Sequence, residues 1–310
     1  MAYYLGIDGG GTKTRCVLGD ETTVLATAMT GGSNIIRLGE TQAREALHTA
    51  IHQACAAVRI SPDQIHAICI GVAGASIPEI AAKIRGILAE IMPKISLTNI
   101  EVVGDNVIAL EAAFGTGPGV IAIAGTGSMV DGRDAAGRSA RAGGWGFAIS
   151  DEGSGHWIGR RAVSAILHAR DDGLETALAA MVLQAWQLTS IDDLVQRANS
   201  TPPPDFPRLF PIVVRAADEG DSIARDVLAD AGSKLANLAA AVVRRLTPHP
   251  PRGSAPIDML AVAMTGSVFR QSPYVREVFY NTLQTNFPGI DVRQELADPV
   301  EGALARAKRM

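Results

Sequence analysis

Hydrophobic and polar positions along this chain predict the same order of elements twice. In the first half, three apolar runs lie close together, and segments of helical periodicity then alternate with further apolar runs. The predicted strands are residues 3–8, 15–19, 24–29, 66–72 and 100–104, and the predicted helices are residues 41–58, 77–91 and 106–114. A meander of three strands followed by strands that alternate with helices predicts a mixed β-sheet covered by helices.

The breaker run Gly115-Thr116-Gly117-Pro118-Gly119 ends the first series, and a second series begins after it. Its predicted strands are residues 119–124, 128–132, 138–142, 259–264 and 290–293. Its predicted helices are residues 155–170, 174–186, 191–197, 209–219, 222–246, 274–287 and 300–308, with proline-rich loops at 201–207 and 247–256. The repeat is one of topology rather than of sequence, and it predicts two duplicated α/β halves with a nucleotide cleft between them.

Each predicted half opens with a glycine-rich turn directly after an apolar strand. The first is Ile7-Asp8-Gly9-Gly10-Gly11-Thr12-Lys13, and the second is Ala124-Gly125-Thr126-Gly127-Ser128. Glycine turns sharply and lets backbone N–H groups approach phosphate oxygens without a Cβ in the way. Neither turn matches a P-loop or a G-x-G-x-x-G dinucleotide motif. Two such turns favour a nucleoside triphosphate held by both halves, although ordinary hairpins also contain Gly-Thr and Gly-Gly pairs.

The composition narrows the class of protein. The 310 residues are 47% hydrophobic but only 5% aromatic, so we expect an aliphatic core and enough chain for two domains. A net charge of −4 without a lysine or arginine block argues against a nucleic-acid partner. We find no membrane-length apolar stretch and no signal peptide, and we therefore expect a cytoplasmic protein with no membrane partner. Cys16, Cys55 and Cys69 are dispersed, which is typical of buried small hydrophobes.

Two aspartates follow predicted strands at positions where phosphoryl transfer needs carboxylates. Asp8 can hold Mg²⁺ or its water, because Mg²⁺ prefers one or two carboxylates plus phosphate oxygens. Asp105 lies at the carboxyl edge of the predicted sheet and can accept the proton of an attacking hydroxyl. Both also have structural explanations, Asp8 as a turn residue and Asp105 as a helix N-cap. The candidate phosphate-binding residues of the two turns are Gly10, Gly11, Thr12, Lys13, Gly125, Thr126 and Gly127, with Ser128 as a further hydroxyl.

A second group of residues has the chemistry of a sugar site. Within the stretch that runs from Gly143 to Trp157, Trp145 offers a flat apolar face to a pyranose ring and Asp151 can accept bonds from sugar hydroxyls. Asn34 can donate and accept toward the same sugar, and the backbone at Gly266 and Ser267 is placed to meet a nucleoside. The structural alternative makes Trp145 a core anchor, Asp151 a helix cap and Gly-Ser-Asn a routine loop.

These motifs resemble those of the actin-like sugar-kinase and ATPase superfamily over essentially the whole chain. Within it, the chain is similar to the N-acetylglucosamine kinase branch of the BadF/BadG/BcrA/BcrD (benzoyl-CoA-reductase-activator-type) ATPase family. The glycine turns are shared across the superfamily, whereas Gly143-Gly144-Trp145-Gly146 with Ser150-Asp151-Glu152-Gly153-Ser154 is more specific to this branch. The three cysteines have no counterpart to the iron–sulfur ligands of the family's redox activators.

The resemblance implies an α/β fold of two ribonuclease-H-like domains that close on ATP, Mg²⁺ and an amino sugar. It implies an N-terminal domain of residues 1–118 joined by a closing helix in 298–310, and a C-terminal domain of residues 119–297 with helical insertions. Asp105 becomes the base on the C6 hydroxyl, and Thr12 and Thr126 lie at the phosphates. The implied sugar contacts are Asn34, Gly144, Trp145 and Asp151.

The expected activity is ATP-dependent phosphorylation of an amino sugar, with N-acetylglucosamine as the first candidate. Glucosamine, N-acetylmuramic acid and glucose stay open as substrates, and a homodimer stays open as the oligomeric state. Two other functions also stay open: an ATPase that drives a conformational change in a protein partner, and a nucleotide or sugar sensor without turnover.

Overall fold

The computed structural model describes residues 2–247 and 260–310, which divide into two compact units. Unit 1 comprises Met1–Gly117 and Ala297–Met310, and unit 2 comprises Pro118–Leu296. The sequence places the two boundaries one residue later, after residues 118 and 297. No helix in the described ranges is long and apolar enough to cross a membrane.

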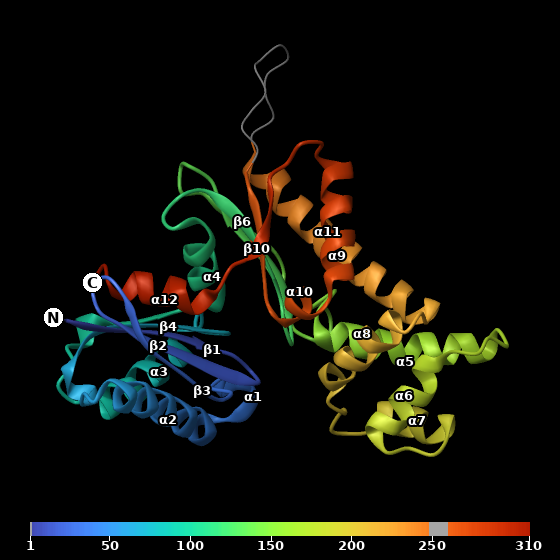
Figure 1. The fold of residues 1–310 in the computed structure, drawn as a ribbon, viewed down its shortest axis with the longest axis horizontal. Helices are drawn as coiled ribbons and strands as arrows, with labels where there is room; N and C mark the ends of the chain where they lie inside the picture. Colours follow the sequence, from blue (N-terminus) through green and yellow to red (C-terminus); the bar gives the residue numbers. More distant parts are fainter. Residues whose placement is uncertain (1, 248–259) are drawn as a thin grey trace, which may run out of the picture. The chain divides into compact units, whose positions relative to one another are not determined.

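Unit 1 is a five-stranded sheet with helices on both faces (Figure 1). Its strands are β1 (Tyr3–Gly9), β2 (Lys13–Gly19), β3 (Val24–Gly31), β4 (Ile65–Val72) and β5 (Ile100–Val103). Its helices are α1 (Ile35–Leu38), α2 (Glu40–Val58), α3 (Pro78–Ile91), α4 (Asp105–Phe114) and α12 (Pro299–Ala307), with short 3₁₀ turns at Pro62–Gln64 and Leu97–Asn99. The strand order is β3-β2-β1-β4-β5, and α1 and the two 3₁₀ turns are the elements that the sequence pattern does not predict.

Alternation along β1 sends its side chains to two different layers. Leu5 and Ile7 join the main core together with residues of α2 and α3, and Asp8 belongs to the opposite set of side chains. On that opposite face, α12 packs against β1 and β4 beside α4. The same alternation in β2 puts Cys16 in the main core and Val17 against α12, so Arg15 shares the α12 face with Asp8.

Two glycines let α12 come close to its neighbours in unit 1. A Cβ on Gly6 of β1 would lie 2.3 Å from the backbone nitrogen of Leu304, and one on Gly302 would lie 2.0 Å from the carbonyl oxygen of Ile108 in α4. Neither position tolerates a side chain without moving the helix. Arg306 near the end of α12 makes an ion pair with Glu101 of β5, which ties the helix to the sheet as well.

Unit 2 has the same sheet order as unit 1, with a larger set of helices. Its strands are β6 (Gly119–Ala124), β7 (Ser128–Arg133), β8 (Ser139–Gly143), β9 (Val262–Thr265) and β10 (Val292–Leu296). Its helices are α5 (Gly155–Asp171), α6 (Ala177–Trp186), α7 (Ile191–Ala198), α8 (Phe210–Asp218), α9 (Ser222–Leu246), α10 (Ser267–Gln271) and α11 (Pro273–Asn286), with a 3₁₀ turn at Phe206–Leu209. In both sheets three antiparallel strands are followed by two parallel ones, which confirms the predicted repeat of topology.

Most element predictions in unit 2 are confirmed, with differences at the ends. The helix predicted from residue 174 begins at Ala177, because the Thr176 side chain accepts a hydrogen bond from the Leu178 N–H and caps it. The strand predicted for 259–264 is β9 from Val262; residue 259 and most of the 247–256 loop lie outside the described residues. Helix α10 and the 3₁₀ turn at Phe206–Leu209 are not predicted, because each is too short to show a period.

Candidate active site

The first glycine-rich turn is the tip of the β1–β2 hairpin in unit 1. The Gly10 N–H donates to the Lys13 carbonyl over 3.0 Å, and the Ser33 N–H donates to the Gly10 carbonyl over 3.1 Å. The Thr14 hydroxyl donates to the Ser33 hydroxyl in a buried bond of 2.8 Å. Thr12 and Lys13 are exposed at the tip. Hydrogen bonds to Ser33 therefore fix the buried side of the turn, while Thr12 and Lys13 face away from the core.

Asn34 and α1 lie directly behind this turn. The Asn34 side chain caps α1 by accepting from the Arg37 N–H over 3.2 Å. Arg37 in turn packs on the turn, since a Cβ on Gly11 would lie 3.3 Å from its Cδ atom. The structure thus brings Asn34 together with Gly10 and Gly11, and it gives the Asn34 amide a capping role that the sequence interpretation did not include.

Two neighbouring carboxylates of unit 1, Asp105 and Asp298, act on the Asp8 carboxylate near the carboxyl end of β1. The pKa of Asp8 is raised to about 6, chiefly by burial and then by the nearby negative charges of Asp105 and Asp298, while the positive charges of Arg15 and Lys13 act to lower it. Asp8 is the next-to-last residue of β1, and Asp105 comes shortly after β5. The strands β1 and β5 lie on either side of β4 in one parallel set. A site with this much negative charge suits a cation or a group that takes up a proton.

Asp105 is the first residue of α4 rather than its cap. Gly104 occupies the N-cap position without any side-chain hydrogen bond, and the Asp105 carboxylate accepts from the Asn106 N–H over 3.1 Å. A carboxylate in the first helical turn is stabilised by the helix dipole, which favours its ionised form. The N-cap explanation of Asp105 is therefore wrong.

The second glycine-rich turn, in unit 2, is held by backbone hydrogen bonds from the start of α5. The Gly125 N–H donates to the Gly127 carbonyl over 2.9 Å, which closes the turn. The Gly155 N–H donates to the Gly125 carbonyl over 2.8 Å, and the His156 N–H donates to the Thr126 carbonyl over 3.2 Å. The start of α5 therefore holds the turn through its carbonyl groups, while the Gly125 N–H bonds within the turn itself.

Asp151 lies against this second turn. A Cβ on Gly127 would come within 2.9 Å of Asp151 Oδ2, so only glycine leaves room for the carboxylate. Asp151 is buried, and burial raises its pKa against the opposing hydrogen bonds from the Ser128 and Gly146 N–H groups. Its φ of 65° is in the left-handed region, a strained conformation for a non-glycine residue that is often found at functional sites.

Gly266 and Ser267 also reach the second turn. Gly266 has a φ of 107°, and a Cβ there would lie 2.2 Å from the Ala124 carbonyl oxygen. Ser267 Oγ lies 3.9 Å from the Cβ position of Gly125. The carboxyl ends of β6 and β9 therefore bring Gly125, Thr126, Gly127, Asp151, Gly266 and Ser267 together in unit 2.

Trp145 stands on an exposed loop that follows β8. Its side chain is 67% exposed, and the guanidinium carbon of Arg141 lies 5.0 Å from the centre of its ring. Gly144 places this loop against the second turn, since a Cβ there would lie 3.5 Å from the Ser128 carbonyl oxygen. The explanation of Trp145 as a core anchor is therefore wrong, whereas Trp157 packs against the core of unit 2.

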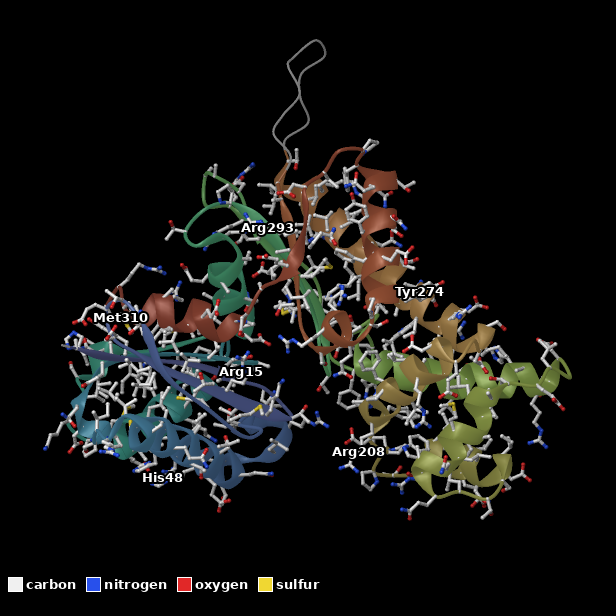
Figure 2. All side chains as sticks on the ribbon, in the orientation of Figure 1. Arg15, His48, Arg208, Tyr274, Arg293 and Met310 are labelled. Carbon is white, nitrogen blue, oxygen red and sulfur yellow. The ribbon has the colours of Figure 1, made fainter. Side chains whose placement is uncertain are left out.

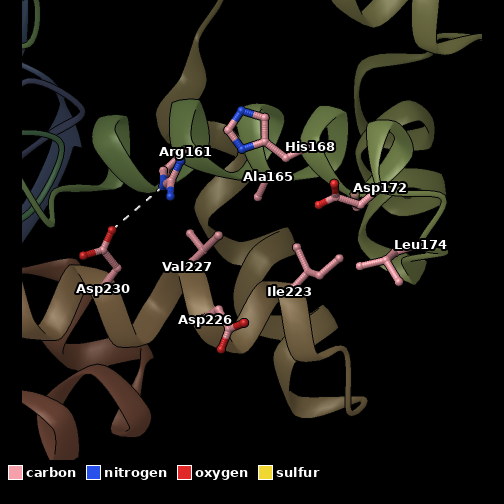
Figure 3. Close-up of a pocket in the computed structure, with 10 residues that line it drawn as sticks. Arg161, Ala165, His168, Asp172, Leu174, Ile223, Asp226, Val227 and Asp230 are labelled. Carbon is pink, nitrogen blue, oxygen red and sulfur yellow. Dashed lines mark ion pairs between the residues drawn. The ribbon is translucent and has the colours of Figure 1, made fainter.

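Two hollows lie in the helical part of unit 2. One, of about 400 Å³, adjoins the Trp145 loop; its lining includes Phe147, His156, Arg160, Ser164 and Asn199. The other lies between α5 and α9, where Arg161 and Asp230 form an ion pair of 3.9 Å (Figure 3). The second hollow contains none of the residues singled out from the sequence, so we assign it no part in the site.

The carboxylates of unit 1 fit Mg²⁺ only as a partial ligand set. Among residues 2–247 and 260–310, no three His, Cys, Asp or Glu side chains converge as a metal-binding group. A Mg²⁺ ion bound at Asp8 would therefore take its other ligands from phosphate oxygens and water, which is the usual arrangement for nucleotide-bound Mg²⁺. The negative charge around Asp8 supports this assignment.

Sequence reasoning missed Arg15 and Asp298. The Arg15 Nη1 atom donates to Asp298 Oδ1 over 2.6 Å, and Arg15 is labelled in Figure 2. Arg15 has a detectable signal, because a tight hairpin around Gly9–Thr14 places it opposite Asp8. The sequence signal for Asp298 is weak, because it consists only of an Asp-Pro pair before a helix. The place of Asp298 in the fold depends on the return of the chain to unit 1.

The fold and the two turns define a two-domain ATPase of the sugar-kinase type. The chain belongs to the BadF/BadG/BcrA/BcrD ATPase family, whose model matches residues 5–306. Both the predicted fold class and the predicted family are thereby confirmed.

Several relatives are amino-sugar kinases. The chain is 32% identical to an N-acetylmuramic acid/N-acetylglucosamine kinase of Clostridium acetobutylicum, over 99% of each protein. It is 28% identical to an N-acetyl-D-glucosamine kinase of Dictyostelium discoideum, over 98% of this chain and 97% of the relative. A crystal structure of a candidate N-acetylglucosamine kinase from Chromobacterium violaceum superposes with a TM-score of 0.77 at 28% identity, over 99% of both chains.

Proposed function

We propose that this chain is a kinase that transfers the γ-phosphoryl group of ATP to the C6 hydroxyl of an amino sugar, with N-acetylglucosamine as the first candidate. The observation that carries the proposal is end-to-end similarity to kinases of N-acetylglucosamine and N-acetylmuramic acid. The two glycine-rich turns and the carboxylates beside the first turn supply the chemistry that such a reaction needs.

Asp105 is the proposed general base. The C6 hydroxyl gives its proton to the Asp105 carboxylate while its oxygen bonds to the γ-phosphorus and the bond to the β,γ-bridging oxygen breaks, which releases ADP. Asp105 lies in the first turn of α4, and its carboxylate accepts from the Asn106 N–H over 3.1 Å. Asp8 lies close enough to Asp105 for the two carboxylates to interact electrostatically.

The two turns are the proposed phosphate-binding groups. In unit 1 these are Gly10, Gly11, Thr12 and Lys13, and in unit 2 they are Gly125, Thr126 and Gly127. The backbone at Gly266 and Ser267, beside the second turn, is the proposed contact of the nucleoside. Asp8 would hold Mg²⁺, which supplies neutralisation of charge on the phosphate oxygens when bound. Each turn is held in place by hydrogen bonds within it and to its neighbours, so phosphate would meet a preformed backbone.

The sugar contacts are proposed for Asn34 in unit 1 and for Gly144, Trp145 and Asp151 in unit 2. An exposed tryptophan on a glycine-flanked loop can lie flat against a sugar ring, which an aromatic residue buried in the core cannot do. The raised pKa of Asp151 reflects a desolvated carboxylate, and such a group gains most from hydroxyl donors.

A panel of sugars tests the proposal directly. ADP release should rise strongly with N-acetylglucosamine, glucosamine or N-acetylmuramic acid, and mass spectrometry should find the phosphorylated sugar. Glucose serves as the matched compound without the amino substituent. Steady ADP release that no sugar stimulates would indicate an ATPase acting on a partner, and nucleotide binding without any ADP release would indicate a sensor; either result overturns the proposal.

A further inference from the structure

Arg15 lies beside Asp8 but makes its ion pair elsewhere. The two residues are directly opposite each other in the β1–β2 hairpin, and both belong to the face that α12 covers. Cβ atoms of directly opposite residues are about 4.5–5.5 Å apart, and opposite charges at such positions ordinarily pair. In the described part of the chain, however, no ion pair within 4 Å joins Arg15 to Asp8.

Asp298 forms an ion pair with the Arg15 guanidinium and does not cap the helix that it precedes. Arg15 Nη1 lies 2.6 Å from Asp298 Oδ1, and both side chains are about three-quarters buried, at 24% and 26% exposure. Asp298 stands at the N-cap of α12, where an aspartate normally accepts from a backbone N–H, yet its side chain makes no capping bond. Its carboxylate is therefore committed to Arg15.

We propose that Asp298 is a positioning residue that withholds Arg15 from Asp8, so that the Asp8 carboxylate stays open to a divalent cation and its nucleotide. This inference rests on the proposed function for the identity of the ligand. Without Asp298, the Arg15 guanidinium is left beside a carboxylate on the neighbouring strand. An arginine–carboxylate pair can form two parallel hydrogen bonds, and these would occupy the oxygens that the metal needs.

The test compares Asp298→Asn with the double variant Arg15→Met/Asp298→Asn. The probe is Mn²⁺ together with ADP, with free Mn²⁺ measured by electron paramagnetic resonance. Asp298→Asn should weaken Mn²⁺ binding about tenfold, which corresponds to about 1.4 kcal/mol. The double variant should return to within about twofold of the wild type, because no guanidinium remains to compete for Asp8.

The ion pair of Arg306 and Glu101 supplies a matched control at the other end of α12. Its side chains are 23% and 27% exposed, which matches the burial of the Arg15–Asp298 pair. Glu101→Gln should lower the melting temperature by about as much as Asp298→Asn does, but it should leave the Mn²⁺ affinity unchanged. A purely structural role for Asp298 predicts instead that the double variant binds Mn²⁺ no better than Asp298→Asn.

Two results overturn the inference: wild-type Mn²⁺ affinity in Asp298→Asn, or a double variant that stays as weak as the single one. Failure of the proposed function is a separate observation. If the proposed function is wrong, the wild-type protein will phosphorylate no amino sugar. The Mn²⁺ affinities of the variants are measured without any sugar, so they test the inference independently.

Discussion

The glycine-rich turn of unit 1 and that of unit 2 follow equivalent central strands in sheets of the same order, β1 and β6. Their surroundings differ. Beside the first turn, the Asp8 carboxylate is repelled by Asp105 and Asp298 and attracted by Arg15 and Lys13. The second is held by backbone hydrogen bonds from the start of α5 and by the single buried carboxylate of Asp151. The two halves of the repeated fold therefore differ: the first turn is surrounded by charged side chains, and the second is held by backbone hydrogen bonds.

This difference separates two kinds of contribution to one reaction. The proposed base and the proposed cation ligand lie around the first turn, so their loss should affect the rate and its dependence on pH. Residues around the second turn fix the positions of backbone groups and of an exposed tryptophan, so their loss should affect binding. Variants of Asp105 and Asp8 test the first kind of contribution, and variants of Trp145 and Gly127 test the second.

Replacing the proposed base should have the largest effect. Asp105→Asn should lower kcat by about a hundredfold or more, because a general base contributes about 10²–10⁴ to the rate. Binding of ATP and sugar, measured by calorimetry, should be nearly unchanged, since the amide is close in size to the carboxylate. Turnover within a few-fold of the wild type would reduce Asp105 to a residue of the first helical turn.

Replacing Asp8 by Asn should raise the stability of the protein while abolishing its activity. Its pKa is raised to about 6 in the fold from the ordinary value of 3.8, so the folded state binds more protons than the unfolded state between these values. The wild type should therefore lose stability as pH rises through that window. Asp8→Asn removes this pH-dependent loss of stability. Above pH 6 the variant should be more stable than the wild type by up to about 3 kcal/mol, at 1.36 kcal/mol per unit of pKa. It should nevertheless be inactive, because it lacks the proposed cation ligand.

Urea unfolding at several pH values checks the Asp8 prediction. The difference in unfolding free energy between the two proteins should be small at pH 4 and should reach its full size near pH 7. A difference that does not vary with pH would mean that the charge of Asp8 is not the cause.

Trp145 should affect binding alone. Trp145→Ala should raise the sugar KM about tenfold, a loss of about 1.4 kcal/mol, and leave the KM for ATP and the melting temperature nearly unchanged. Trp157→Ala is the matched control; it should cost about 3–5 kcal/mol of stability with little change in sugar KM, because Trp157 packs on the core. The idea fails if Trp145→Ala lowers the melting temperature and spares the sugar KM.

Gly127 should show the smallest effect. A Cβ there would lie 2.9 Å from Asp151 Oδ2, whereas a Cβ on Gly125 would have no atom closer than 3.9 Å. Gly127→Ala should displace the Asp151 carboxylate and raise substrate KM values about fivefold, since such overpacking costs about 1 kcal/mol. Gly125→Ala should change them much less, and equal effects in both variants would contradict the close contact with Asp151.

The sequence predicts the repeated sheet well, because its strands are short apolar runs bounded by glycine and proline. It also singles out both glycine turns, whose neighbours lie close in sequence. It does not show that Asn34 caps α1, that Trp145 is exposed, or that Asp298 pairs with Arg15. The Arg15–Asp298 pair joins distant segments, about which periodicity carries no information. The Asn34 cap is local, but α1 has only four residues and is too short to show a helical period. A homodimer and a cytoplasmic location stay predictions.

The return of α12 to unit 1 has a consequence for synthesis on the ribosome. The sheet of unit 1 is built from the first 117 residues, but its β1 and α4 surfaces are covered by a helix that emerges about 180 residues later. Unit 2, whose residues are continuous in sequence, can fold while unit 1 still exposes the groove at Gly6 and Ile108. The nascent N-terminal unit must therefore stay unaggregated with one apolar face uncovered until residues 297–310 leave the exit tunnel.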